Sequence, residues 1–162
     1  MAILIVYASK HGSTQGIAER IAEKLRQLGK EAEARPVDAV DDPGSYEAIV
    51  IGSAVYYGYW LKEATEWVHH HQAVLAGHPV WLFSVGPLGT EVQDAEQQPK
   101  EMTEFREAIG PREQRIFFGA LDHHKLSFAE RMMVKAVRAP EGDFRDWQAV
   151  EAWAASIVRD LV

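Results

Sequence analysis

Apolar residues fall into short blocks along the chain, and the period of each block predicts its secondary structure. Four blocks are continuous and mainly apolar, which is typical of strands in a parallel sheet. They are residues 3–8, 48–53, 80–85 and 116–121. Residues 32–37 are more polar and contain Pro36, which predicts an edge strand because proline has no N–H to donate to a neighbouring strand.

Other apolar residues recur every three or four positions, which is the period of an amphipathic helix. The first predicted helix ends at Gly29, and the third ends at Gly110-Pro111. The residues with this spacing, helix by helix, are Ile17, Ile21, Leu25 and Leu28; Leu61, Ala64, Val68 and Leu75; Met102, Phe105 and Ile109; and Trp147, Val150, Ala154, Ile157 and Leu161.

The alternation of strands and helices predicts an α/β fold with three layers, in which helices cover both faces of a five-stranded parallel sheet. With the polar second strand at an edge, the expected strand order is 2-1-3-4-5. Ligands of such sheets bind beyond the carboxyl ends of the strands, so the loops after strands 1, 3 and 4 are the candidate site. With 162 residues and no internal repeat, residues 1–162 are expected to form one domain.

The loop after the first strand, residues 9–14, has the composition of a phosphate-binding loop. The first N–H groups of a helix lack partners and carry the positive end of its dipole, so they stabilise an anion. Gly12 allows the backbone to turn closely around a ligand. Hydroxyl and ammonium donors come from Ser9, Lys10, Ser13 and Thr14. The alternative is an ordinary turn whose serine and threonine residues only cap the helix.

The other two loops have different compositions. Residues 54–60, Ala-Val-Tyr-Tyr-Gly-Tyr-Trp, contain four aromatic side chains within five positions, which suits a flat conjugated ring that needs stacking partners. Residues 84–90, Ser-Val-Gly-Pro-Leu-Gly-Thr, are rich in glycine. The alternative for the aromatic residues is that they pack beneath the following helix.

Composition excludes several kinds of chemistry. The chain has no cysteine, so thiol catalysis and cysteine-ligated iron–sulfur clusters are excluded, and redox activity would need an organic cofactor or a non-thiolate metal. A formal net charge of -7 argues against general nucleic-acid binding. No apolar run approaches the length of a membrane span and no signal peptide is indicated, so a cytoplasmic location is expected.

Other protein classes with this architecture are excluded by the residues at the strand ends. A phosphoacceptor receiver domain needs acidic residues after strand 1 and an aspartate after strand 3, but the chain has Tyr7-Ala8-Ser9 and Gly52-Ser53-Ala54 there. The dinucleotide motif G-x-G-x-x-G and the nucleotide motif G-x-x-x-x-G-K-[ST] are also missing from the first loop. The 9–14 loop therefore suits a single terminal phosphate.

A metal site is not predicted from the histidines. His69, His70 and His71 are consecutive in a predicted helix, so their side chains point ~100° apart and cannot converge on one ion. We expect them to face solvent.

The first loop resembles the [ST]-x-x-G-x-T loop with which the flavodoxin-like family binds the phosphate of FMN. Ser9, Gly12 and Thr14 match this pattern, and His11 stands where many flavodoxins have threonine. Along nearly its whole length the chain also resembles the menaquinone-dependent protoporphyrinogen IX dehydrogenase subgroup and its short relatives. The segments that carry this resemblance are residues 9–14, 51–54, 57–58, 119–121, 128–135 and 146–147.

The resemblance implies a flavodoxin-like oxidoreductase that binds FMN noncovalently. The implied phosphate contacts are Ser9, Lys10, His11, Gly12, Ser13 and Thr14. The implied contacts with the flavin ring are Ala54, Val55, Tyr56, Tyr57, Gly58, Ser84, Val85, Gly86, Pro87, Leu88 and Gly89. No residue is identified as a general acid or base.

Residues 122–146 are longer than an ordinary connection between a strand and a helix. A capping box at 127–130 and the apolar stripe after it predict an extra helix between strand 5 and the last helix. Arg131, Lys135 and Arg138 share one face of this helix. In the resembling dehydrogenases an insertion here is associated with the substrate and the membrane side, so this face is a candidate contact for an anionic porphyrin, a quinone or a partner. The alternative is a covering helix with a solvated basic face.

Two functions remain open at this stage. One is an enzyme that oxidises protoporphyrinogen or a related small molecule with a quinone as acceptor, and the other is an electron carrier between protein partners. A domain that has lost its flavin and serves only in binding is a third alternative. The sequence leaves the electron donor, the acceptor and the oligomeric state undetermined, so a homodimer and a peripheral membrane contact both stay open.

Overall fold

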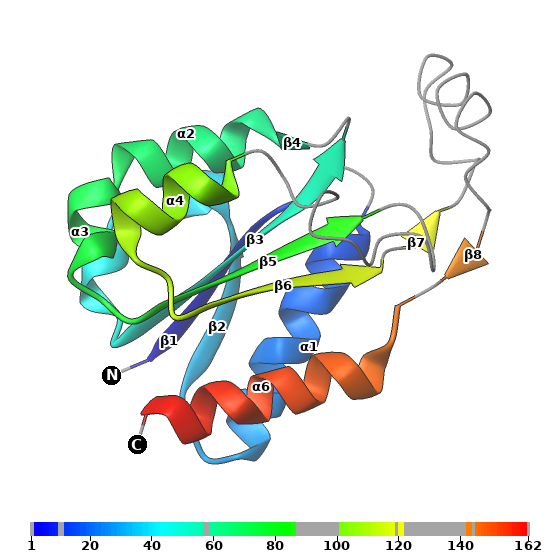
Figure 1. Ribbon diagram of the computed structural model, residues 1–162. Helices are drawn as coiled ribbons and strands as arrows, with labels where there is room; N and C mark the ends of the chain where they lie inside the picture. Colours follow the sequence, from blue (N-terminus) through cyan, green and yellow to red (C-terminus); the bar gives the residue numbers. More distant parts are fainter. Residues whose placement is uncertain are drawn as a thin grey trace.

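A parallel sheet lies between two layers of helices in the computed structural model of the protein (Figure 1). The strands are β1 (Ile3–Ala8), β2 (Ala32–Pro36), β3 (Ala48–Tyr56), β5 (Val80–Gly86) and β6 (Glu113–Phe118), with the short β4 (Tyr59–Trp60) antiparallel to the end of β3. Their order, β2-β1-β3-β5-β6, confirms the predicted order 2-1-3-4-5. The structure describes residues 2–9, 12–56, 59–86, 101–118, 120–121, 142–143 and 145–161.

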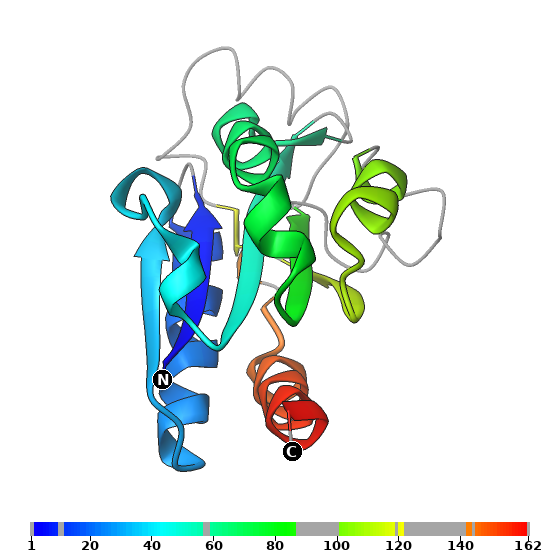
Figure 2. The ribbon, with the colours of Figure 1, turned by 90° about the vertical axis from the view of Figure 1, so that its left-hand side faces the viewer.

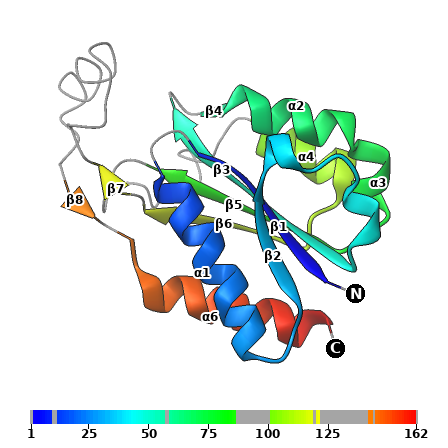
Figure 3. The ribbon, with the colours of Figure 1, turned by 180° about the vertical axis from the view of Figure 1, so that it is seen from behind.

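The helices are divided between the two faces of the sheet. One face is covered by α1 (Ser13–Gln27) and α6 (Trp147–Leu161), and the other by α2 (Lys62–His70), α3 (Gln72–Ala76) and α4 (Met102–Ile109) (Figures 1 and 3). The short 3₁₀ helices η1 (Val37–Ala39) and η2 (Pro43–Ser45) connect β2 to β3. None of the helices in the described ranges is long and apolar enough to cross a bilayer.

The central strands are buried on both faces because each successive side chain points to the opposite layer of helices. In β1 the side chains alternate between a core cluster shared with α1 and α6 and a second cluster shared with α2 and α4. The first cluster takes Ile3, Ile5 and Tyr7, and the second takes Leu4, Val6 and Ala8. This explains why the blocks at 3–8, 48–53 and 80–85 are almost entirely apolar.

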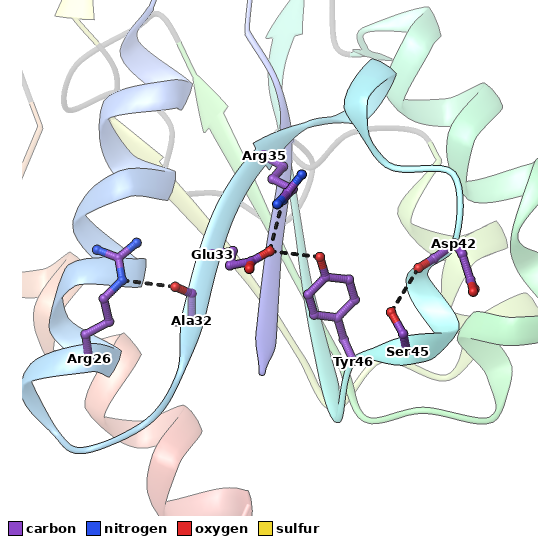
Figure 4. Close-up of polar contacts among 7 residues, drawn as sticks. All are labelled: Arg26, Ala32, Glu33, Arg35, Asp42, Ser45 and Tyr46. Carbon is purple, nitrogen blue, oxygen red and sulfur yellow. Dashed lines mark hydrogen bonds and ion pairs between the residues drawn. The ribbon is translucent and has the colours of Figure 1, made fainter. Parts of the chain in front are cut away.

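Polar contacts hold the edge strand β2 (Figure 4). The Tyr46 hydroxyl and the Arg35 Nε–H both donate to Glu33 Oε2, each at 2.9 Å. These two hydrogen bonds stabilise the ionised carboxylate and lower the pKa of Glu33. At the end of α1, Arg26 Nε donates to the carbonyl of Ala32 at 3.0 Å. The polar second strand therefore suits its predicted place at the edge.

The helix predicted from Leu61 to Leu75 is divided into α2 and α3 at His71. This residue has φ -106° and ψ 15°, outside the usual helical range. Its side chain is only 9% exposed, and its ring contacts Trp67 with 4.7 Å between centroids. The prediction that the three consecutive histidines face solvent is therefore wrong for His71, because the break in the helix turns its ring toward Trp67. His69 and His70 are exposed as predicted.

Two element boundaries differ from the predictions. The fifth strand was expected at 116–121 but spans Glu113–Phe118, because an edge strand accepts polar residues while its backbone pairs with β5. The helical spacing of the first helix was expected to include Leu28, but α1 ends one residue earlier and Leu28 is 43% exposed. In both cases the element ends before the last residue of the apolar pattern.

The two ends of the predicted insertion lie side by side. Residues Ala120–Leu121 (β7) pair antiparallel with Gly142–Asp143 (β8) in a separate two-stranded sheet (Figure 1). The helix predicted between them and its basic face lie outside the described residues.

An aromatic cluster on the α6 side of the sheet depends on a glycine in β3. The ring of Phe83 packs edge-on against Phe117 and Trp153, at centroid distances of 6.2 and 6.0 Å. Gly52 is the register partner of Phe83 in the neighbouring strand, and a Cβ at this position would lie 2.0 Å from Phe83 Cζ. Only glycine leaves room for the ring here.

We expect Gly52→Ala to lower the free energy of unfolding by about 1–3 kcal/mol, because the added methyl group displaces Phe83 from its aromatic neighbours. Gly77→Ala is the matched control, since its Cβ would meet its nearest neighbour, the carbonyl oxygen of Val74, at an ordinary 3.7 Å. Chemical denaturation measures both variants. Equal stability of the two would contradict the packing role of Gly52.

Candidate functional site

The ends of β1, β3 and β5 meet at the carboxyl end of the sheet. The strand register places Ala8 beside Ser53, and Ala54 beside Val85. The three loops in which site residues were predicted therefore begin side by side. Among the predicted contacts, the structure describes residues 9, 12–14, 54–56 and 84–86.

The chain passes from β1 into α1 through a left-handed glycine. Gly12 has φ 92° and ψ -11° directly before the first helical residue, a conformation that side chains other than glycine's rarely allow. Its N–H donates to Ser9 Oγ at 3.0 Å, and its carbonyl accepts from the N–H of Gly16 at 3.0 Å. Ser9 therefore holds the turn, and its own O–H donates to no acceptor among the described residues, so it can donate to a ligand.

The start of α1 is left uncapped by the described side chains. No side chain among them accepts a hydrogen bond as the N-cap of this helix, and its first turn contains no acidic residue. The alternative of a turn whose serine and threonine side chains cap the helix is therefore not adopted by the residues that the structure describes. The first N–H groups and the positive end of the helix dipole remain available to an anion.

Thr14 in the first turn of α1 is fully buried, and its Oγ1 has no hydrogen-bond partner in the described part of the chain. A buried hydroxyl without a partner costs about 1–3 kcal/mol, so native proteins keep few of them. An anionic oxygen bound at the helix start would supply the missing partner. The orphaned hydroxyl, the uncapped helix and the left-handed glycine together fit an anion-binding site.

The aromatic residues after β3 have different environments. Trp60 is only 3% exposed: its Nε1–H donates to Ser84 Oγ at 2.8 Å, and its ring lies 5.3 Å from that of Phe105 in α4. Trp60 is thus a core residue rather than a stacking partner for a ligand, because β4 folds back on β3 and turns this side chain inward. Tyr59, beside it, is 50% exposed.

Buried hydroxyls connect the segments around this strand end. Ser53 Oγ accepts from the N–H of Leu61 at 3.0 Å and donates to the carbonyl of Ala54 at 2.8 Å. Ser84, predicted as a cofactor contact, accepts the hydrogen bond from Trp60 Nε1–H. Val85 and Gly86, which follow it, are also buried in the strand. These three residues determine where the loop after β5 begins.

Sequence reasoning missed Glu101, which precedes α4. Its Oε2 accepts from the backbone N–H of Trp60 at 2.7 Å and so links α4 to β4. Its Oε1 is buried and has no partner among the described residues. No sequence signal could have found this contact, because it joins two segments that only the fold brings together.

Several predicted site residues lie outside the described ranges, and their roles stay predictions. They are Lys10, His11, Tyr57, Gly58, Pro87, Leu88, Gly89 and, in the insertion, Arg131, Lys135 and Arg138; of Tyr56 only the backbone is described.

The consecutive histidines serve different contacts. His69 contacts Glu104 on α4, whereas the rings of His70 and His71 meet at 4.7 Å. Over the ranges that the structure describes, no group of three or more histidine, aspartate or glutamate side chains is arranged to hold a metal ion.

The strand order and the uncapped start of α1 fit a flavodoxin-type domain. The chain belongs to this family, because the flavodoxin domain family model matches residues 4–148. Among curated proteins it is similar to the protoporphyrinogen IX dehydrogenase [quinone] of Escherichia coli strain K12. The two are 24% identical over 171 residues, which cover 97% of this chain and 94% of that protein.

Two solved structures show the same fold at low sequence identity. One is the rubredoxin oxygen:oxidoreductase of Desulfovibrio gigas, with a TM-score of 0.66 and 15% identity; the match covers 99% of this chain but only 36% of that larger one. The other is a flavoprotein in complex with FMN from Lactobacillus acidophilus NCFM, with a TM-score of 0.56 and 16% identity, covering 71% of this chain and 92% of that one.

We expect Thr14→Val to raise the free energy of unfolding by up to about 1 kcal/mol in a buffer free of phosphate and sulfate, because it removes a buried hydroxyl that lacks a partner. Thr65→Val in the first turn of α2 is the matched control: its hydroxyl donates to the carbonyl of Leu61 at 3.5 Å, so its loss brings no gain. Urea denaturation compares the two. The assignment is contradicted by a Thr14→Val variant that is less stable than the wild type.

Proposed function

We propose that residues 1–162 form one flavodoxin-like domain that binds FMN noncovalently and works as an oxidoreductase through it. The observation that carries this proposal is the start of α1, where an uncapped helix terminus lies next to the unpartnered hydroxyl of Thr14. Membership of the flavodoxin family and the likeness to an FMN-containing structure support the same cofactor. FMN supplies one- and two-electron chemistry that the side chains of a cysteine-free chain lack.

The 9–14 loop is proposed to hold the phosphate. The backbone N–H groups of Ser13 and Thr14 and the Thr14 hydroxyl donate to its oxygens, and the Ser9 hydroxyl adds a donor while it keeps the Gly12 turn in place. Lys10 supplies a positive charge, and His11 supplies a ring N–H in place of the usual threonine hydroxyl. All of these groups favour an anion over a neutral ligand.

The flavin ring is proposed to lie between the loops that follow β3 and β5. Ala54, Val55 and Tyr56 end β3 on one side, Tyr57 and Gly58 continue from it, and residues 84–89 form the other side. Within this arrangement Ser84, Val85 and Gly86 set the start of their loop, while Glu101 and Ser84 keep Trp60 and β4 in place. Tyr57 is the proposed stacking residue.

The reaction that we propose is the oxidation of protoporphyrinogen or a related small molecule with a quinone as acceptor. Support comes from the similarity to the Escherichia coli dehydrogenase, which extends over nearly the full length of both chains. The basic residues Arg131, Lys135 and Arg138 are proposed to receive the anionic substrate. No residue is assigned as a general acid or base.

A second candidate is a flavodoxin-type carrier that passes electrons between protein partners. It is favoured by the match to the flavodoxin domain family over residues 4–148 and by the fact that electron transfer needs no general acid or base. The two candidates share the cofactor and differ in what exchanges electrons with it.

The cofactor is tested by titrating the purified chain with FMN and following visible absorption and flavin fluorescence. We expect Thr14→Val and Gly12→Ala each to weaken FMN binding about tenfold or more, because a hydrogen bond to a charged group is worth about 1.5–3 kcal/mol and the turn needs a positive φ. Gly29→Ala, at φ +89°, is the control for backbone strain away from the site and should bind FMN like the wild type. A colourless wild-type protein that does not bind FMN would refute the proposal.

Anaerobic turnover separates the enzyme from the carrier. With FMN bound, the enzyme oxidises protoporphyrinogen IX when a quinone is present, and replacing Arg131, Lys135 and Arg138 with glutamine lowers that rate while FMN binding is kept. A carrier shows no such turnover but is reduced and reoxidised by protein partners. Unchanged turnover in the glutamine variant would count against the proposed role of the basic face.

A further inference from the structure

A cavity of about 820 Å³ lies at the carboxyl ends of β1 and β2. Its walls come from the end of β1, the start of α1, the segment that follows β2, and helix α2. The segment that follows β2, which contains η1, lies beside α2 (Figure 2). The volume is in the range of sites for small molecules. This cavity lies on the β2 side of β1, whereas the proposed flavin ring lies between the loops after β3 and β5. The cavity shares Ser9 with the proposed phosphate loop.

His71 lines this cavity without a polar partner. Its side chain is only 9% exposed, and within the described part of the chain its ring makes only ring contacts, with Trp67 and His70, each at 4.7 Å. Burial, with a smaller contribution from His70, lowers the pKa of His71 against the opposing effect of Asp42 and Asp41. At neutral pH the ring is uncharged and presents one N–H donor and one acceptor nitrogen. Both can pair with a ligand in the cavity.

The cavity is strongly acidic. Asp38, Asp41, Glu63 and Glu66 line it, while none of the described residues around it is a lysine or an arginine. Glu66 forms an exposed ion pair with Lys62 at 3.7 Å, a contact of little energetic weight. Burial raises the pKa of Tyr7 in the cavity wall, and the negative charges of Glu19 and Asp38 raise it further.

Aromatic rings supply the apolar part of the wall. The side chains of Trp67 and Tyr7 are both buried, and the Trp67 Nε1–H donates to the carbonyl of Val40 at 3.0 Å. Trp67 therefore offers the cavity ring surface rather than a donor. A ring surface beside carboxylates suits a molecule with a positive group on an apolar body.

We propose that this cavity binds a small organic cation, an amine or guanidine carried on an apolar or aromatic body. The carboxylates of Asp38 and Asp41 attract the positive group, Trp67 and Tyr7 pack against the body, and His71 hydrogen-bonds to it. The site does not depend on FMN, although Ser9 lines the cavity and also belongs to the 9–14 loop.

Calorimetric titration of the full chain with tyramine, an aromatic primary amine, tests this site, with p-cresol as the neutral analogue of nearly the same body. We expect tyramine to bind at least about tenfold more tightly than p-cresol, both with and without FMN, because only the amine engages the carboxylates. Equal affinity for the two compounds, or no binding of tyramine, would overturn the proposal whether or not FMN binds.

Variants place the binding in the cavity. Asp38→Asn/Asp41→Asn should weaken tyramine binding about tenfold, whereas Glu31→Gln/Asp160→Asn, which changes the net charge equally with exposed residues outside the cavity, should leave it unchanged. His71→Phe keeps a ring but removes both nitrogens and should cost about two- to tenfold. If the two double variants bind tyramine alike, the cation is bound elsewhere and the proposal is wrong.

Discussion

Burial of β1, β3 and β5 on both faces is the constraint on which the rest of this structure depends. Strands between two layers of helices have little room for unpaired polar side chains, so their residues are almost all apolar. The polar chemistry of the chain is thereby confined to the strand ends and the segments that follow them. Because the strands are parallel neighbours, three of these ends reach the same end of the sheet.

Unsatisfied polar groups gather at that end. In the described ranges the buried side-chain atoms without a hydrogen-bond partner are Thr14 Oγ1 and Glu101 Oε1, one at the start of α1 and the other next to β4. His71 adds a nearly buried ring with no polar contact. The two buried atoms of Thr14 and Glu101 each cost stability in the free protein. Thr14 lies at the start of α1 and Glu101 next to β4, so both of these buried atoms belong to segments that adjoin the proposed site.

Local pattern was a good guide wherever the physical cause is local. The central strands, the edge position of the strand with Pro36 and the turn at Gly12 all follow from burial, a missing N–H and a positive φ. The burial and contacts of a side chain were harder to predict where they depend on residues far away in the sequence. Trp60 belongs to the core because its Nε1–H donates to Ser84 Oγ and its ring packs against Phe105, and the sequence near residue 60 predicts neither contact.

The sequence by itself determined the α/β architecture, the order of the strands and the loop of residues 9–14 at the start of a helix, since these depend on hydrophobic period and on the chemistry of neighbouring residues. Only the tertiary structure decided that Thr14 is left without a partner, that Glu101 reaches Trp60 and that His71 turns inward. It also joined Tyr7, Asp38 and Glu63 around one cavity. The reason is that parallel strands separated by long crossovers bring together residues that are far apart in the chain. The sequence around each residue does not predict these contacts.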